Sequence, residues 1–266
     1  MASVRLLELH DRPWFPEFLR REVVDALQMV LEATSAYLPV APRLREALDR
    51  AGARRVLDLF SGAGGPWPSL VRLFEKEGPA PPEIFLTDKY PDTAKSSAAE
   101  PAPNHIHFIS EPVDATEIPE QLAGFRTIFS SLHHFNPCEA RCFLQDSASK
   151  RRGVGIFEAA SRHTLSMLSI FFIPVADWLL APFRRPFRWS RLLWTYLIPV
   201  VPFVLLFDGL ASCLRAYSLA DLLNLTDGLT TEDYKWEIGE ENGGWLPVQI
   251  TYVIGCPKKI SAVQAN

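Results

Sequence analysis

VLDLFSGAGG, residues 56–65, joins an apolar run to a glycine-rich turn. The run RRVLDLF (54–60) has the length and composition of a buried strand, and Asp58 stands near its end. Gly62 and Gly64 carry no Cβ, so the turn can adopt positive φ and a ligand can approach its backbone closely. In open parallel sheets, ligands bind at such carboxyl ends of strands. The stretch therefore predicts a strand, a turn that can bind a ligand, and then a helix.

Strand-like runs recur along the next hundred residues, separated by helical or loop segments: EIFLTD (83–88), HIHFIS (105–110), FRTIFSS (125–131) and GVGIFEA (153–159). This alternation predicts βαβ units and a parallel sheet that is covered on both faces. Near the end of the chain, DYKWEIGE (233–240) and PVQITYVIG (247–255) are joined by ENGGWL, which predicts a hairpin. We therefore expect an α/β, Rossmann-like, mostly parallel sheet with an antiparallel C-terminal hairpin.

Helical segments are expected on both sides of this sheet region. Apolar residues recur at three- and four-residue steps from Pro16 to Tyr37, and a second helix fits 43–51, closed by Gly52. We interpret 1–266 as a single domain. It is divided into a helical N-terminal cap (1–52), a core with the glycine-rich turn (53–160), an apolar helical insertion that forms a lid (161–232) and the C-terminal hairpin (233–258).

The composition excludes several classes of protein. Of 266 residues, 48% are hydrophobic and 22% are charged, which excludes a disordered chain. The net charge of −4 argues against a general binder of nucleic-acid phosphates, so we expect no nucleic-acid partner. Four cysteines are too few for a disulfide scaffold. Charges near the N-terminus interrupt any apolar run there, so we expect no secretory signal peptide and a cytoplasmic protein.

Polar side chains follow the next strands of the predicted sheet. Asp88 ends the second strand, where a carboxylate can accept both hydroxyls of a ribose. Asp114 lies beyond the third, where it can bind an adenine amino group. The fourth strand runs into SSLHHFNP (130–137), in which small residues leave room for a ligand and two histidines follow. Because parallel strands end at one edge of the sheet, these residues predict a single ligand site.

In this order, the segments VLDLFSGAGG, FLTDKYPD, PVDATEIP, IFSSLHHF and GIFEAA resemble the class I S-adenosylmethionine-dependent methyltransferases. Within that family the chain looks most similar to the small-molecule group that includes the ubiquinone- and menaquinone-biosynthesis enzymes. The resemblance covers about 53–160 and the hairpin. It implies a seven-stranded sheet whose last strand is antiparallel to the others, S-adenosylmethionine as the cofactor, and methyl transfer as the reaction.

The resemblance also implies which residues bind the cofactor. Asp58 would lie near its methionine end, with Gly62 and Gly64 beneath it, and Asp88 would bind the ribose. One residue departs from the family pattern, because Phe60 stands where the family usually opens this loop with a glycine. By the same resemblance, Asp114 and Ala115 would bind the adenine, and Ser130 would form the wall beyond the fourth strand.

Three residues are candidates for the catalytic chemistry. His133 or His134 can act as a general base, since imidazole titrates near neutral pH. Alternatively, both histidines line the pocket without taking part in catalysis. Glu158, at the end of the fifth strand, is a second candidate to contact the substrate.

Two other kinds of site would use the same residues. LDLFSGAGG also resembles the cofactor loop of DNA cytosine-5 methyltransferases, and Cys138 follows a proline where those enzymes keep their nucleophile. GIFEAA lacks the Glu-Asn-Val expected on the fifth strand, however, and no target-recognition domain is evident. A zinc site made of His133, His134, Cys138 and Cys142 lacks the usual ligand spacing, so we expect no metal.

Residues 164–207 are the most apolar part of the chain. TLSMLSIFFIPVADWLLAPF (164–183) is broken only by Asp177, and LLWTYLIPVVPFVLLF (192–207) contains no charge. Three interpretations remain open. The segment forms a helical pair that packs on the sheet or at a homodimer interface, a lid over an apolar substrate pocket, or a surface that inserts shallowly into a membrane interface, where Trp and Arg lie at headgroup level.

The sequence thus predicts S-adenosylmethionine-dependent methyl transfer to a small, lipophilic acceptor. The expected partners are that small-molecule substrate, a membrane surface contacted through 164–207 by a protein peripheral to it, and a second copy of the chain. The alternative from another class is a non-catalytic module that binds S-adenosylmethionine or associates with a membrane.

Overall fold

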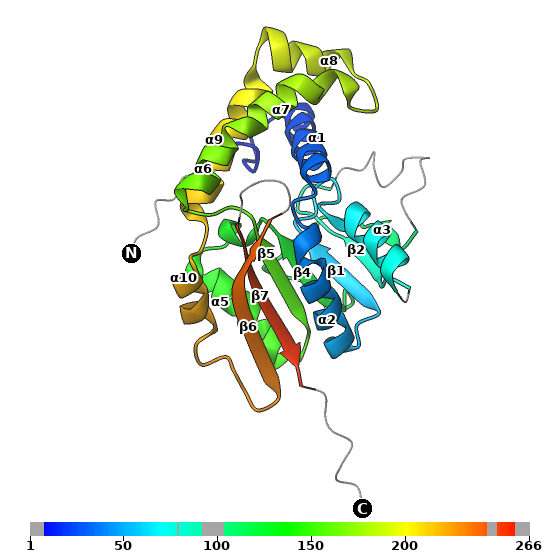
Figure 1. Ribbon diagram of the computed structural model, residues 1–266, viewed down its shortest axis with the longest axis vertical. Coiled ribbons are helices and arrows are strands. Elements are labelled where there is room, and N and C mark those ends of the chain that lie inside the picture. The colour runs from blue at the N-terminus through cyan, green and yellow to red at the C-terminus, as the bar shows by residue number, and fades with distance from the viewer. Residues whose placement is uncertain (1–7, 79, 92–103, 244–248, 259–266) are drawn as a thin grey trace, which may run out of the picture.

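A seven-stranded sheet forms the centre of the computed structural model, which describes residues 8–78, 80–91, 104–243 and 249–258 (Figure 1). The strand order is β3-β2-β1-β4-β5-β7-β6. β1 to β5 pair in parallel, and β7 is antiparallel to both of its neighbours. The predicted fold class is confirmed. The strands are β1 (Arg55–Leu59), β2 (Glu83–Leu86), β3 (Ile106–Phe108), β4 (Phe125–Phe129), β5 (Val154–Glu158), β6 (Tyr234–Asn242) and β7 (Gln249–Pro257).

The strand order reverses beside β1. The chain passes from β1 outward to β2 and β3 and then returns to the other side of β1 with β4. All residues of β4 and β5 are buried, as expected for strands covered on both faces. A crevice opens at the carboxyl ends of the strands where such a reversal occurs. The fold therefore locates the ligand site above β1 and β4, where the glycine-rich turn begins.

Helices cover both faces of the sheet. On one face, Leu44 and Trp67 belong to the same apolar cluster as Ile84 of β2, and on the other, Leu144 and Leu222 belong to the cluster that contains strand residues of β1, β4 and β5. The last of these helices falls within the segment predicted as a lid, but it packs on the sheet instead. The four helices are α2 (Ala41–Ala51), α3 (Trp67–Glu77), α5 (Pro137–Ser149) and α10 (Leu219–Thr226).

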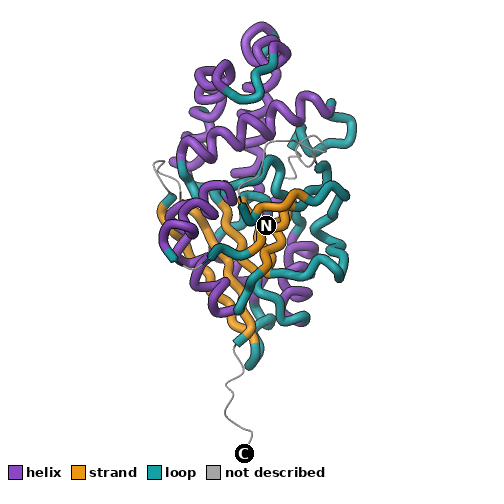
Figure 2. Tube along the Cα trace, turned by 90° about the vertical axis from the view of Figure 1, so that its right-hand side faces the viewer, coloured by secondary structure: helices purple, strands orange, loops and turns teal. Residues whose placement is uncertain are grey.

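A separate helical layer lies above the carboxyl edge of the sheet (Figures 1 and 2). It consists of α1 (Glu17–Thr34) and the lid helices, a name used below for residues 164–215. Val23 of α1 and Leu205 of the lid belong to a third apolar cluster of this layer. The lid helices are α6 (Thr164–Ile170), α7 (Phe172–Leu180), α8 (Trp189–Leu192) and α9 (Val200–Arg215). Short 3₁₀ helices occupy Leu38–Val40, Leu132–His134 and Ala181–Phe183, and a short π-helix occupies Leu193–Leu197.

Charged side chains of the helical layer point inward and form ion pairs. Arg191, which is only 1% exposed, donates from Nε to Glu22 Oε2 over 2.7 Å. Arg184 is paired in the same way with Asp177, the residue that interrupts the first apolar run. All four side chains are buried. Burial of a charge is tolerated where a partner of opposite charge lies within hydrogen-bonding distance.

The outer surface of the lid helices is apolar. Thr164–Phe183 contains an 18-residue window with a mean hydropathy of 1.7, of which 17% is buried, and this meets the length and composition of a membrane span. Trp189–Leu197 and Val200–Arg215 meet the same test together but are bent by 68°. The large exposed apolar side chains of this surface are Leu165, Leu168, Phe171, Phe172, Val175, Trp178, Leu179, Phe183, Phe187, Trp189, Leu193, Tyr196, Leu197, Ile198, Phe203 and Leu214.

Candidate functional site

A cavity of about 1290 Å³ lies between the carboxyl edge of the sheet and the helical layer. Its lining comes from the loops after the five parallel strands, from α1, α6, α7 and α9, and from the N-terminal segment that starts at Glu8. Pockets for one drug-sized ligand have volumes of roughly 300–1000 Å³. This cavity is therefore large enough for two small molecules at once.

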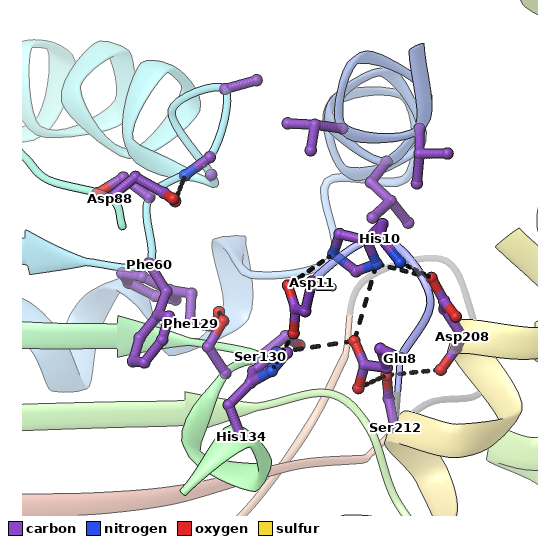
Figure 3. A pocket seen from close by; sticks show the side chains of 18 of the residues that line it. Glu8, His10, Asp11, Phe60, Asp88, Phe129, Ser130, His134, Asp208 and Ser212 are labelled. Carbon is purple, nitrogen blue, oxygen red and sulfur yellow. Dashed lines mark hydrogen bonds and ion pairs between the residues drawn. The ribbon is translucent and has the colours of Figure 1, made fainter. Parts of the chain in front are cut away.

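The loop after β1 is tied to the end of β2. The backbone N–H of Gly62 donates to Asp88 Oδ2 over 2.8 Å, and the other oxygen of Asp88 accepts from the N–H of Tyr90 (Figure 3). Asp88 therefore holds the loop in place while it lines the cavity. Gly62 has φ +53°, and a Cβ there would lie 3.3 Å from Val24 of α1. The glycine thus allows α1 to pack closely over the loop.

Phe60 and Gly64, on either side of Gly62, also adopt positive φ. Phe60 adopts φ +57°, the left-handed conformation that a glycine would adopt without strain, and its ring stacks on that of His134. The glycine missing from the family pattern is thus replaced by a strained residue that packs against the site. Gly64 has φ +123° and does not line the cavity, so its role is to form the turn.

Asp58 lies beneath the loop and is only 2% exposed. Its carboxylate accepts from Thr127 Oγ1 over 2.6 Å and from Ser61 Oγ over 2.7 Å. Burial outweighs these hydrogen bonds and raises the pKa of Asp58 to about 6. Asp58 lines the cavity, so it can hold a ligand that rests on the loop.

The residues predicted on the adenine side and on the far wall also line the cavity. Asp114 is half-exposed and pairs with Lys89 Nζ over 2.8 Å. Partial burial raises the pKa of Asp114, but the hydrogen bonds from Lys89 and Thr116 outweigh this and lower it to about 2. Ala115 is buried beside it. Ser130, with φ +46°, contacts the hydroxyl of Tyr37 and accepts from the N–H of Ala159.

His133 is buried between two carboxylates. Its Nδ1 lies 3.0 Å from Glu158 Oε2, and its Nε2 lies 3.1 Å from Glu8 Oε1. Burial alone would lower the pKa of His133, but the two carboxylates outweigh it and raise the pKa to about 10. Glu158 does not line the cavity. It therefore orients His133 from behind, and a protonated His133 is poorly suited to act as a general base.

His134 and His10 extend this polar cluster, which Figure 3 shows on the opposite side of the cavity from Asp88. His134 Nδ1 lies 2.7 Å from Asp11 Oδ2, and His10 Nδ1 lies 2.7 Å from Asp208 Oδ2. Burial would lower the pKa of His10, but the carboxylates of Asp208, Asp11 and Glu8 outweigh it and raise the pKa to about 9. Burial would raise the pKa of Glu8, but His134, His133 and His10 outweigh it and lower that pKa far below its usual range.

The sequence matches no known protein-family model and no curated protein. Among solved structures, the chain is similar to the plantazolicin methyltransferase BpumL in complex with SAH, with a TM-score of 0.59, 11% identity and 94% of each chain covered. It is also similar to human N-acetylserotonin methyltransferase in complex with SAM, with a TM-score of 0.54 and 14% identity over 95% of this chain and 60% of that one. The chain has the class I methyltransferase fold.

Within this methyltransferase fold, the two less favoured kinds of site are not assembled. Cys138 and Cys142 are exposed on α5 and do not line the cavity. Asn136 instead caps α5 by accepting from the N–H groups of Cys138 and Glu139, with Pro137 in the first turn. The Asn-Pro-Cys sequence is therefore a helix start, and the histidines meet Glu8 rather than cysteines.

Several residues of the site were not predicted. Glu8, His10 and Asp11 come from the N-terminal segment ELHD, and Asp208 comes from the middle of α9. Ser212, one turn further along α9, donates to Glu8 over 2.9 Å. The available signals were the alternation of acid and imidazole groups in ELHD and a single aspartate within an apolar run.

Proposed function

We propose that the protein transfers the methyl group of S-adenosylmethionine to a small acceptor. The observation that carries this proposal is that Asp58 near the end of β1, Asp88 after β2 and Asp114 after β3 line one cavity at the carboxyl edge where the strand order reverses. The cavity volume of about 1290 Å³ has room for both cofactor and acceptor. The finer resemblance to ubiquinone and menaquinone enzymes remains a prediction.

The cofactor is proposed to lie across the glycine-rich loop. Asp58 and Gly62 would flank its methionine end and Asp88 its ribose, with Gly64 shaping the turn. The adenine would lie near Asp114 and Ala115, against the wall formed by Ser130. The hydrogen bond from Gly62 to Asp88 supports this assignment, because it couples the loop to the residue that would bind the ribose.

The acceptor is proposed to lie between the loop and the lid helices, with its nucleophilic atom near His134. Leu27, Ile173 and Leu205 line this part of the cavity, which suits a lipophilic molecule. Alignment of the two reactants and exclusion of water can supply most of the rate of such a transfer. His133 and His134 would contact the acceptor, and Glu158 would position His133.

Calorimetry with S-adenosylmethionine tests the cofactor site. Asp88→Ala removes the acceptor for Gly62 and the proposed ribose contact, so affinity should fall about 100-fold, since hydrogen bonds to charged groups contribute about 1.5–3 kcal/mol each. Asp88→Asn keeps one oxygen for Gly62 and should lose less. Asp233→Ala, on an exposed aspartate paired with Arg151, is the matched control. Unchanged affinity in Asp88→Ala contradicts the assignment.

Turnover separates the enzyme from the alternative function. Incubation with radiolabelled S-adenosylmethionine and a panel of lipophilic alcohols, phenols and amines should transfer label to an acceptor. Tight binding of the cofactor without transfer to any member of the panel would favour a non-catalytic binding module.

We further propose that the outer surface of the lid helices contacts a lipid bilayer, as part of a cytoplasmic protein peripheral to the membrane. Phe183, Trp189 and Leu197 are 76–79% exposed, and Arg185 is exposed among them. Exposed Trp and Phe with an adjacent Arg suit the headgroup level of a membrane. The inward pairing of Arg184 supports this, because it removes a charge from that surface.

Flotation with vesicles of phosphatidylcholine and phosphatidylglycerol tests the membrane contact. The protein should float, and the combined variant Phe183→Gln, Trp189→Gln, Leu197→Gln should remain at the bottom of the gradient. Leu219→Gln with Leu223→Gln changes exposed apolar residues of α10 and is the matched control. If the protein stays off vesicles and the triple variant instead dissociates a homodimer, the surface is an interface between two copies and the membrane proposal is wrong.

A further inference from the structure

Three potential ligand groups converge at the polar end of the cavity. Glu8 Oε1 lies 3.1 Å from His133 Nε2, and Glu8 Oε2 lies 3.7 Å from His134 Nε2. All three groups offer ligand atoms within 4.8 Å of one another. A tetrahedral ion about 2.0–2.1 Å from each ligand holds neighbouring ligand atoms about 3.3 Å apart. The distances from the Glu8 oxygens to the two Nε2 atoms, 3.1 Å and 3.7 Å, lie on either side of that value.

The far side of each imidazole supplies a second, independent observation. His133 Nδ1 faces Glu158 Oε2 at 3.0 Å, and His134 Nδ1 faces Asp11 Oδ2 at 2.7 Å. Metal-binding histidines usually donate the other ring N–H to a carboxylate, which fixes the ring orientation and leaves Nε2 available for the metal. Both histidines have this arrangement here, and both direct Nε2 toward Glu8.

We propose that Glu8, His133 and His134 bind one divalent transition-metal ion of the zinc type. Two imidazoles and one carboxylate form a donor set that zinc sites with an open fourth position use. Imidazole nitrogen favours zinc over magnesium or calcium, which prefer oxygen ligands. Because Glu8 and both histidines line the cavity, the open position faces the space where the acceptor would lie.

The charges around the cluster favour an added cation. Glu8 contacts the imidazoles of His10, His133 and His134. Three further carboxylates each contact at least one of these imidazoles: Asp11, Glu158 and Asp208. Arg215 Nη1 lies 3.6 Å from Glu8 Oε1 and offsets part of this negative charge. A divalent ion at Nε2 of His133 and His134 would take the place of the proton that His133 carries there and would add positive charge beside these carboxylates.

The ion would also give the site a chemical function. A divalent cation binds and polarises an oxygen atom, and it lowers the pKa of a bound hydroxyl so that the oxygen becomes a better nucleophile. Use of the ion in methyl transfer rests on the proposed function, which would then involve an acceptor oxygen. Binding of the ion does not rest on it.

Metal binding is measured on the full chain after treatment with EDTA and dialysis. Titration with Zn²⁺ should show one site, mass spectrometry should find one ion per chain, and Co²⁺ should produce the visible absorption bands of a bound ion. Asp11→Asn should weaken Zn²⁺ affinity about 10–100-fold, as removal of a carboxylate behind a ligand does in known sites. Glu8→Gln and His134→Ala should lose still more affinity and abolish the Co²⁺ bands.

A second pair of histidines provides the matched control. His105 and His107 both contact Glu83 on the surface, so they test for adventitious binding. The variant His105→Ala, His107→Ala should keep the stoichiometry of one and the Co²⁺ spectrum. Equal affinity in wild type and His134→Ala, or loss of the ion in the control instead, would overturn the proposal. Asp88→Ala should still bind the ion, so failure of the cofactor assignment and failure of the metal site are distinguishable.

Discussion

The sheet region and the helical layer above it distribute charge in opposite ways. In the sheet region, Arg43 and Arg50 pair with Glu237 at the surface, while apolar clusters fill both faces of the sheet. In the helical layer, Glu22 pairs with Arg191 in the interior while Trp189 is 79% exposed. Water favours the first arrangement. The second arrangement is the one expected if the outer surface of the lid helices contacts a bilayer, as proposed above.

Stability in the two regions should therefore depend on different side chains. Exposed ion pairs such as Arg43–Glu237 contribute about 0–1 kcal/mol. A buried pair contributes little in net terms, but removal of one partner leaves an uncompensated charge that costs about 3–5 kcal/mol. The largest effects on folding in the helical layer should come from single substitutions in its charged interior.

Arg191→Met tests this contrast most severely. It leaves Glu22 buried without the partner at 2.7 Å, so the free energy of unfolding should fall by about 3–5 kcal/mol. Arg188→Met is the matched control, because Arg188 is partly exposed and lies 3.6 Å from Glu22, and it should cost about 1 kcal/mol or less. Urea unfolding followed by circular dichroism measures both. Equal losses would show that the buried pair has no special role.

Asp58 sharpens the comparison, because hydroxyl groups rather than arginines surround this buried carboxylate. Its pKa is raised from 3.8 to about 6, so the folded state binds the proton more tightly than the unfolded state does. The free energy of unfolding of the wild type should therefore fall as pH rises from about 4 to about 6. Asp58→Asn cannot titrate and should gain up to about 3 kcal/mol relative to wild type across that range.

Hydrogen bonding around Asp58 can adapt to the substitution. Ser61 Oγ lies 3.0 Å from the main-chain oxygen of residue 58, so its hydroxyl can donate there and accept from the new amide. Thermal or urea unfolding at pH 4 and pH 7 measures the difference between wild type and Asp58→Asn. A difference that does not change with pH would mean that the carboxylate of Asp58 titrates normally.

The smallest effect is expected on the outer surface of the lid helices. Phe183→Gln with Leu197→Gln should change the free energy of unfolding by less than about 0.5 kcal/mol, since both side chains are 76% exposed. Leu205→Ala, in the apolar cluster between α1 and the lid, should cost about 2–5 kcal/mol. A large fall in the free energy of unfolding of the Gln variant would show that Phe183 and Leu197 stabilise the fold instead of forming an exposed contact surface.

The sequence allowed the sheet to be predicted because its signals are local. Each strand is a short apolar run, and Asp58, Asp88 and Asp114 lie at or beyond the carboxyl ends of strands that run in parallel, so that these ends meet at one edge. Gly52 ended a helix in the left-handed conformation, as its position predicts. The residues of the cofactor loop could therefore be grouped without knowledge of distant contacts.

The polar end of the cavity could not be predicted in this way. Glu8 meets Ser212 and His133, and His10 meets Asp208, through contacts that no periodicity of the sequence records. The histidine pair was recognised, but its carboxylate partners were not, apart from Glu158 as a candidate to contact substrate. Likewise, Asp177 marked a break in an apolar run, and only the fold revealed Arg184 as its partner.

The contact between Glu8 and Ser212 has a consequence for synthesis of the protein. The two residues are 204 positions apart, and both lie at the polar end of the cavity. At roughly 5–20 residues per second, a ribosome needs about 10–40 s to make the intervening chain. The five parallel strands are all made within that time, whereas α9, which the N-terminal segment contacts, is made only at its end. Completion of the site should therefore be a late event on the ribosome, well after the sheet can begin to form.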